Sequence, residues 1–334
     1  MAVNVVQCVN TFGDRIVAFV DGDKLRPLKE FHSVYDAAWS AAETGTNLET
    51  LIRDAISDKS LDYDEIYELK SDWKLLPPFD HPRNASNLLV TGTGLSHRKS
   101  ADNRNAMHSK GNETISDSMK IYQWGIEGGQ PAIGQFGTAP EWFWKGDGDM
   151  VRSHGETLVC PWYGEDGGEE AEIAGVYIVG PDGQPLRVGF AATNEFSDHV
   201  MESRNYLYLA PSKLRECSIG PELVIGGSFD TVEGEAAILR GEEVIWAQPL
   251  ASGEPNMVHS LANLEHHHFK YPQHRRPGDA HIYFFGTPGF SYGSGIRLED
   301  GDVMFVRFDG YGRPLLNVLR IDITAPALQQ VRQL

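Results

Sequence analysis

Two short apolar segments joined by a turn constrain the fold of this chain more than any other feature. They cover residues 173–179 and 186–192, and they flank Pro181-Asp182-Gly183-Gln184. Pro, Asp and Gly are typical turn residues, each for its own conformational reason. The sequence therefore predicts two neighbouring strands, of which the first is half-buried.

Three glutamates lie at the ends of these segments. Glu170 and Glu172 precede the first segment, and residues i and i+2 of a strand point to the same face, so their carboxylates should lie side by side. Glu195 follows the second segment, and the turn brings it back toward the other two. Carboxylates gathered and buried in this way repel one another, which favours a cation among them.

Oxygen ligands alone favour a hard cation. Mg²⁺ is the first candidate, with Mn²⁺ or Ca²⁺ as alternatives, whereas zinc prefers nitrogen and sulfur. Residues 165–172 are acidic in any case, and an acidic run is also typical of a solvated surface. The spacing alone leaves both interpretations open.

Further short motifs occur in a fixed order from about residue 90 to the C-terminus. They are Pro140-Glu141-Trp142-Phe143-Trp144-Lys145, Glu170-Ala171-Glu172, Asn194-Glu195-Phe196-Ser197, Lys213, Gly220-Pro221, Pro277-Gly278-Asp279, Gly286-Thr287-Pro288-Gly289 and Gly301-Asp302. In this order they resemble the fumarylacetoacetate hydrolase superfamily. The resemblance implies a divalent metal on Glu170, Glu172 and Glu195, although the family usually has Asp where this chain has Glu195.

We expect an α+β fold that is mainly β. Residues 79–334 are rich in predicted strands, and the resemblance implies a mixed β-sandwich roll with its metal cleft at one open end. Residues 1–78 are predicted to form a small α/β domain, with strands at 3–9 and 15–20. Its predicted helix carries one apolar stripe, formed by Leu48, Leu51, Ile52, Ala55 and Ile56.

Charge and composition exclude several kinds of partner. The chain has 29 Lys and Arg against 47 Asp and Glu, a formal net charge of −18. This balance argues against nucleic acid and anionic membranes, which attract basic surfaces. The first residues show no basic region followed by a long apolar stretch, and no segment reaches the roughly 18 apolar residues of a membrane span. We therefore expect a cytoplasmic protein, and the resemblance implies a homodimer or a larger homo-oligomer.

Two lysines are candidate catalytic and substrate-binding residues. Lys213 follows a predicted helix at 197–207 and a turn at 210–212, and near a metal it could carry a proton or stabilise an enolate. A lone loop lysine is more often solvated, but the resemblance places a lysine of the site here. Lys145 lies in an aromatic segment, from which it could bind an anionic substrate or extend to solvent.

Gly286, Thr287 and His97 complete the candidate site. Gly286 permits close backbone approach and the Thr287 hydroxyl can donate to a carboxylate, although both residues also suit a tight turn. The resemblance favours substrate binding at Thr287. It also places His97 where hydrolases of the superfamily have a water-activating His, but their Glu three residues later is replaced here by Ser100. Asp102 or a distant acid could substitute only if folding brings it close.

The expected ligands suit the chemistry of 2-oxo acids. Mg²⁺ can chelate the carboxylate and keto oxygens of such a substrate and stabilise the enolate that forms when a C3 proton leaves. Loss of a C4 hydroxyl makes a lyase, and attack of water on a C4 carbonyl makes a hydrolase. The resemblance to the sugar-acid-catabolism branch favours a dehydratase that converts a 2-keto-3-deoxy-pentonate to 2,5-dioxopentanoate. The alternatives are a hydrolase of acylpyruvates or other 2,4-dioxo acids and a non-catalytic sugar-acid-binding protein.

Overall fold

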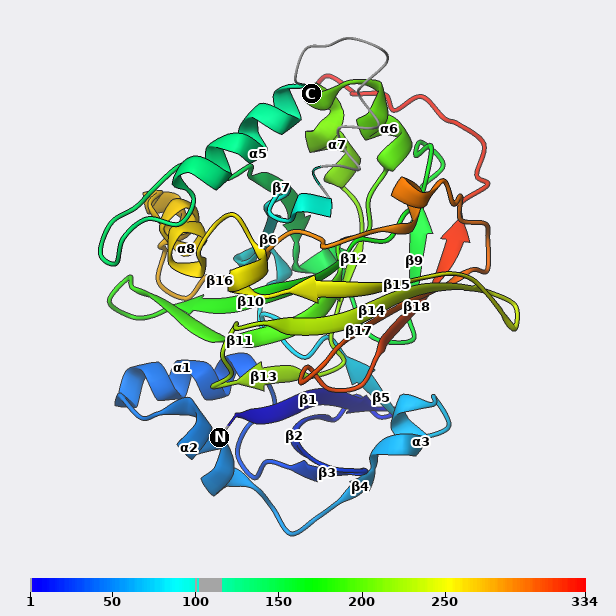
Figure 1. Ribbon diagram of the computed structural model, residues 1–334. Helices are drawn as coiled ribbons and strands as arrows, with labels where there is room; N and C mark the ends of the chain where they lie inside the picture. The colour runs from blue at the N-terminus through cyan, green and yellow to red at the C-terminus, as the bar shows by residue number, and fades with distance from the viewer. Residues whose placement is uncertain (1, 100, 102–115) are drawn as a thin grey trace.

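The computed structural model describes residues 2–99, 101 and 116–334. Ser100 and Asp102, the two possible partners considered for His97, lie outside the described residues. Figure 1 shows the N-terminal strands and helices at the bottom, two sheets in the middle, and α5, α6 and α7 above them. None of the helices in the described residues is long and apolar enough to cross a membrane.

The larger sheet runs through most of the molecule. Its strand order is β4-β3-β2-β1-β13-β11-β10-β16-β6-β7, and β5, β8 and β12 pair beside this path. The strands are β1 (Val3–Asn10), β2 (Arg15–Asp21), β3 (Lys24–Pro27), β4 (Leu61–Asp62), β5 (Trp73–Leu76), β6 (Leu88–Gly92), β7 (Phe143–Asp147), β8 (Val151–Arg152), β10 (Ala171–Val179), β11 (Pro185–Asn194), β12 (Cys217–Ile219), β13 (Leu223–Ile225) and β16 (Ala280–Phe284).

The second sheet has five strands in the order β15-β14-β17-β18-β9. They are β9 (Thr157–Cys160), β14 (Val232–Arg240), β15 (Glu243–Ser252), β17 (Val303–Phe308) and β18 (Leu315–Ile321). Alternate residues of β17 are buried, as expected for a strand with one face on a core. Val306 and Phe308 pack there with Tyr177 and Phe190 of the larger sheet, so the two sheets enclose an apolar core.

Helices flank the two sheets. The described helices are α1 (Val34–Thr44), α2 (Leu48–Ala55), α3 (Tyr63–Tyr67), α5 (Asp117–Gly128), α6 (His199–Arg204), α7 (Leu209–Lys213) and α8 (Leu261–Phe269). Helix α1 begins where Ser33 accepts from the Asp36 N–H and ends at Gly45, whose φ of 66° is left-handed. Its Val34 and Ala37 join a second apolar core, on the side of the larger sheet that faces away from the five-stranded sheet.

The N-terminal strands belong to the larger sheet. Strand β1 pairs with β2 on one side and with β13 on the other, where Val3 lies opposite Ile225. The strands predicted at 3–9 and 15–20 and the helix at 48–56 are thus present as β1, β2 and α2. The domain boundary at residue 78 stays a prediction.

The predicted hairpin is present as β10 and β11, with Ala171 opposite Asn194. At its turn, the Gly180 N–H donates to the Gln184 carbonyl at 2.8 Å. The prediction that the first strand is half-buried was wrong, because β10 is buried along its whole length. Its side chains alternate between the two cores, with Ile173 in one and Ala174 in the other. A continuous apolar run is typical of a strand covered on both faces.

One further local prediction was wrong. Residues 210–212 form part of helix α7 rather than a turn, with Pro211 in its first turn, where the missing N–H is tolerated. His266, His267 and His268 lie on helix α8. Ser260 begins α8 by accepting from the Asn263 N–H.

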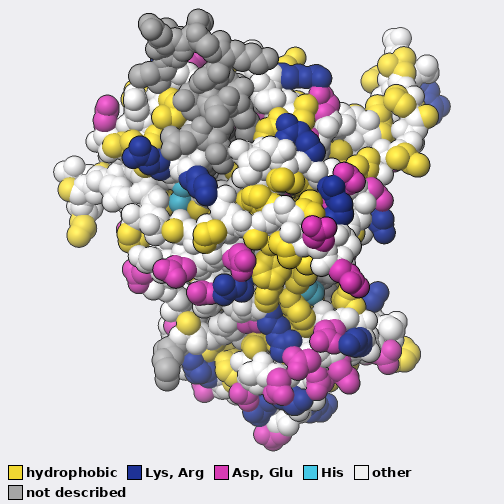
Figure 2. All heavy atoms as spheres, turned by 45° about the vertical axis from the view of Figure 1, so that its right-hand side comes forward, with side chains coloured by type: hydrophobic (Ala, Val, Ile, Leu, Met, Phe, Trp, Pro, Cys, Tyr) yellow, Lys and Arg dark blue, Asp and Glu magenta, His cyan; other side chains and the backbone are white. Residues whose placement is uncertain are grey.

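Acidic side chains are prominent at the molecular surface. On the face that Figure 2 shows, they gather over the N-terminal part at the bottom, while lysines and arginines are dispersed. This distribution agrees with the net charge of −18. An anionic ligand would therefore need cations concentrated at its own site.

Candidate metal centre

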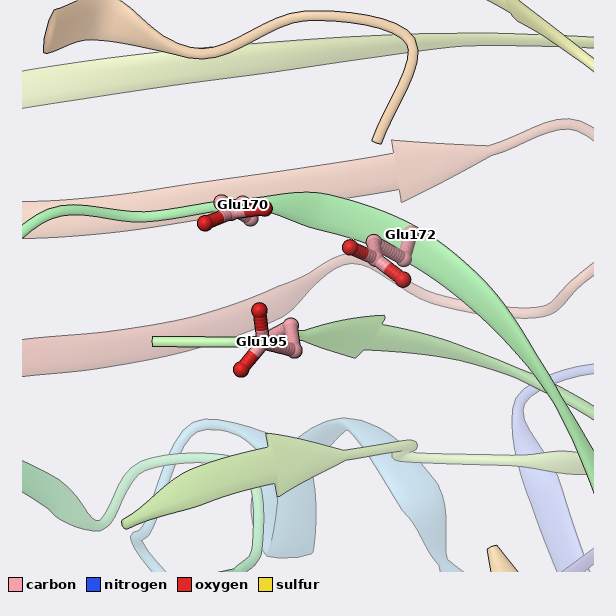
Figure 3. Close-up of side chains that lie close together, drawn as sticks. All are labelled: Glu170, Glu172 and Glu195. Atoms are coloured by element: carbon pink, nitrogen blue, oxygen red, sulfur yellow. The ribbon is translucent and has the colours of Figure 1, made fainter. Parts of the chain in front are cut away.

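The register of the β10–β11 hairpin brings the three glutamates together. Glu170 lies immediately before β10, and its carbonyl accepts the N–H of Glu195 at 2.9 Å. Glu172, within β10, is paired with Thr193 of β11. One carboxylate oxygen from each glutamate lies within 4.8 Å of the others, and Figure 3 shows the three side chains facing one another. The predicted convergence is present in the structure.

Two buried lysines lie against these carboxylates. The Nζ of Lys213 is 2.5 Å from Oε1 of Glu170 and 2.6 Å from Oε2 of Glu195. The Nζ of Lys145 is 2.5 Å from Oε1 of Glu195 and also donates to the carbonyl of Phe196. Both lysines are 0% exposed, so neither is the solvated residue that its sequence also allowed.

The charges around the three carboxylates are uneven. Burial raises the pKa of Glu170, but Lys213 and His199 outweigh burial and lower it overall. Burial raises the pKa of Glu172 well above its ordinary value, and the charges of Glu195 and Glu170 add to this effect. Glu172 is therefore the least compensated of the three carboxylates.

A divalent cation with oxygen ligands fits this arrangement. Two lysine ammonium groups face three carboxylates, and among the described residues no ion pair reaches Glu172. Oε2 of Glu172 accepts the N–H of Gly286 at 2.7 Å, which fixes this carboxylate. Three preorganised carboxylates, one of them without an ion-pair partner among the described residues, are the kind of oxygen ligands that Mg²⁺ or Mn²⁺ favours.

Thr287 and Gly286 lie beside the centre, but with different contacts from those expected. The hydroxyl of Thr287 is 2.9 Å from the carbonyl of Ala171 and 2.8 Å from that of Gly289. Gly286 has a φ of +89°, and a Cβ there would lie 2.0 Å from Oγ of Ser96, so only glycine fits. Their predicted role in substrate binding stays a prediction, and Gly286 has a clear structural task in holding Glu172.

His97 is enclosed by serine side chains. Its Nδ1 is 2.9 Å from Oγ of Ser96 and its Nε2 is 3.3 Å from Oγ of Ser252. Burial lowers the pKa of His97 to about 3, so the imidazole is neutral near pH 7. A neutral imidazole is a poor proton donor, and the catalytic role of His97 stays a prediction.

Sequence reasoning missed several residues of the centre. Nε2 of His199 lies 3.0 Å from Oε1 of Glu170, and Oγ of Ser197 lies 2.9 Å from Nζ of Lys213. Glu169 is fully buried and accepts both the N–H and the hydroxyl of Ser291 at 2.6 Å. The position of His199, four residues after Glu195, was the available signal.

Comparison with known proteins is informative at the level of fold. No family model matches the sequence, and no curated protein matches it. Solved structures do match over 96% of this chain, and the mixed, mainly β architecture with two sheets confirms the expected fold class. A 2-keto-3-deoxyarabinonate dehydratase in a hexagonal crystal form has a TM-score of 0.71 and 19% identity, and the alignment covers 96% of this chain and 100% of that chain.

Two further structures have the same architecture. A 2-keto-3-deoxy-D-arabinonate dehydratase complexed with magnesium and 2,5-dioxopentanoate has a TM-score of 0.69 and 19% identity, over 96% of this chain and 99% of that chain. A 2-hydroxyhepta-2,4-diene-1,7-dioate isomerase from Mycobacterium marinum has a TM-score of 0.58 and 14% identity, over 96% and 100%. Such low identities establish the shared fold alone.

Proposed function

We propose that the protein is a Mg²⁺-dependent dehydratase that converts a 2-keto-3-deoxy-pentonate to 2,5-dioxopentanoate. The observation that carries the proposal is the convergence of Glu170, Glu172 and Glu195 beside Lys213. The proposal is supported by the fold shared with a dehydratase that was solved with magnesium and 2,5-dioxopentanoate. The dehydratase and isomerase neighbours support an enzyme rather than a binding protein.

The three glutamates would hold the cation, each through a carboxylate oxygen. When bound, Mg²⁺ supplies Lewis-acid stabilisation of the negative charge on a 2-oxo acid that loses its C3 proton. Mn²⁺ or Ca²⁺ would suit the same oxygen ligands. The Gly286 N–H holds Glu172 in place before any ligand arrives, because it donates to Oε2 at 2.7 Å.

The lysines of the centre would bind the anionic substrate and move protons. Nζ of Lys213 lies between Glu170 and Glu195, so as an amine it could accept the C3 proton and as an ammonium it could protonate the departing C4 hydroxyl. Burial lowers the pKa of Lys145, which makes its ammonium a stronger acid. Its contact with Glu195 would orient that ligand.

Competing substrates test the proposal. Purified protein with Mg²⁺ is given each enantiomer of a 2-keto-3-deoxy-pentonate and, separately, an acylpyruvate. An aldehyde dehydrogenase coupled to 2,5-dioxopentanoate measures elimination, and loss of diketone absorbance measures cleavage. We expect elimination to be much the faster reaction. Cleavage without elimination from either enantiomer would make the protein a hydrolase, and binding without turnover would make it a sugar-acid-binding protein.

A further inference from the structure

His199 is enclosed beside the candidate metal centre and contacts one of its carboxylates. Its Nε2 lies 3.0 Å from Oε1 of Glu170, and the side chain is 1% exposed. The imidazole stacks on Phe290, with ring centroids 4.8 Å apart and planes inclined by 18°. The ring of Tyr292 lies 5.1 Å away. These aromatic contacts fix the plane of the imidazole.

The segment that carries these aromatic rings is anchored beside the metal centre. Ser291 lies between Phe290 and Tyr292, and both its N–H and its hydroxyl donate to Glu169 at 2.6 Å. Glu169 immediately precedes Glu170 in the sequence. Glu169, which precedes the predicted ligand Glu170, therefore anchors the segment whose Phe290 and Tyr292 rings pack against the imidazole of His199.

The second ring nitrogen of His199 faces another carboxylate. Nδ1 lies 4.0 Å from Oδ2 of Asp166, and both side chains are nearly inaccessible to solvent. Among the described residues, neither atom has a hydrogen-bond partner. The carbonyl of Asp166 accepts from Arg215 at 2.5 Å, which holds the backbone of this residue in place.

We propose that His199 is a positioning residue for the metal centre, which fixes the orientation of Glu170 and is itself oriented by Asp166. This inference rests on the proposed function, because it assumes a cation at Glu170. A ligating carboxylate that accepts a hydrogen bond from an outer residue loses rotational freedom before the metal binds. Loss of such outer partners typically lowers metal affinity by about 10–100-fold.

Gly168 offers an independent way to move the imidazole. A Cβ at this position would lie 2.2 Å from Nδ1 of His199 and 2.6 Å from its Cε1. The backbone N–H and carbonyl of Gly168 both bond to Ser197, at 3.0 and 2.9 Å, so the backbone has little freedom to retreat. Its φ lies outside the left-handed region, so alanine is acceptable to the backbone. Gly168→Ala therefore displaces the ring and removes no polar group.

The test measures Mn²⁺ binding to metal-stripped protein by electron paramagnetic resonance. His199→Phe keeps an aromatic ring against Phe290 but loses the bond to Glu170, so the Kd should rise by about 10-fold or more. Gly168→Ala should produce a similar loss. His199→Gln, whose amide can donate near the position of Nε2, should restore most of the affinity. His154→Phe is the matched control, since His154 is a buried histidine that stacks on Tyr67 and bonds to its carbonyl.

Each outcome decides the inference. If His199→Phe binds Mn²⁺ as tightly as the wild-type protein, the inference is overturned. It is also overturned if His199→Phe binds Mn²⁺ weakly but His199→Gln does not restore the affinity and Gly168→Ala does not show the same loss. Should His199→Phe fail to fold, Gly168→Ala and His199→Gln carry the comparison. Wild-type protein that binds no Mn²⁺ overturns both the metal centre and this inference. Tight Mn²⁺ binding without formation of 2,5-dioxopentanoate contradicts the proposed function alone.

Discussion

The Nζ of Lys213 lies 2.5 Å from Oε1 of Glu170, although the two residues are 43 positions apart in the sequence. The ammonium thus neutralises a predicted metal ligand in a fully buried site. A cation bound at the same carboxylates would repel this ammonium and favour its pairing with an anionic substrate. We therefore expect Lys213 to have two tasks, one in the metal-free protein and one in the reaction.

Lys213→Met separates these tasks. Removing one partner of a buried ion pair costs about 3–5 kcal/mol, so the metal-free variant should lose free energy of unfolding. Mg²⁺ should restore part of this loss because it supplies the missing positive charge. The kcat should fall by about 10²-fold or more if Lys213 moves a proton. Urea unfolding with and without Mg²⁺ and steady-state kinetics measure both effects, with the exposed Lys120→Met as control. An unchanged kcat would remove Lys213 from the reaction.

The ligand set is tested by Glu170→Gln, Glu172→Gln and Glu195→Gln. Each change removes a charge with little change in size, so Mg²⁺ affinity and activity should fall together while the fold persists. Calorimetric titration with Mg²⁺ and circular dichroism provide the measurements. Glu265→Gln is a suitable control, because Glu265 is a partly buried carboxylate held by Tyr177 and Arg187. Full Mg²⁺ affinity in all three variants would exclude this ligand set.

Metal binding should release a proton from Glu172. Burial and the charges of Glu195 and Glu170 raise its pKa, so this carboxyl holds a proton to higher pH than an ordinary glutamate and must lose that proton to become a ligand. Mg²⁺ affinity should therefore rise with pH until Glu172 is ionised without metal. Titration calorimetry in buffers of different ionisation enthalpy detects the released proton. Equal heats in all buffers, after correction for ionic strength, would show that no proton leaves.

His97 should contribute to acid sensitivity. Burial lowers its pKa to about 3 from an ordinary 6.5, so between these values the unfolded chain binds a proton that the folded chain does not. Its contribution to stability is complete above pH 6.5 and is lost as the pH falls toward 3. In His97→Phe, the free energy of unfolding should depend less on pH in this window, by up to about 1.4 kcal/mol per pH unit. Urea titrations at several pH values measure the slope, and a slope equal to wild type would contradict a buried neutral His97.

The local pattern of the sequence predicted the hairpin and its three glutamates. Glu170 and Glu172 are two residues apart, and Glu195 follows a strand that a short turn joins to theirs. The local geometry of one hairpin was therefore enough to predict that the three carboxylates converge. The exposure of the first strand was not predictable from the same pattern. It depends on two cores formed by distant segments, including β1 and β17.

Long-range contacts explain what the sequence did not indicate. His199 meets Glu170 29 positions away, and Lys145 meets Glu195 only because β7 and the end of β11 approach in space. The periodicity of the sequence around these residues does not indicate either contact. The helix that carries His266, His267 and His268 had a local signal in Ser260, but a histidine run does not by itself distinguish a helix from a loop.

A divalent cation should enable this chain to eliminate water from a 2-keto-3-deoxy-pentonate. Proton NMR of chelator-treated protein with this substrate, recorded before and after addition of Mg²⁺, tests it most directly. We predict that signals of 2,5-dioxopentanoate appear only after Mg²⁺ is added, and that Glu172→Gln forms the product far more slowly. Turnover in the metal-free protein, or no product from either enantiomer with Mg²⁺ bound, would contradict the claim.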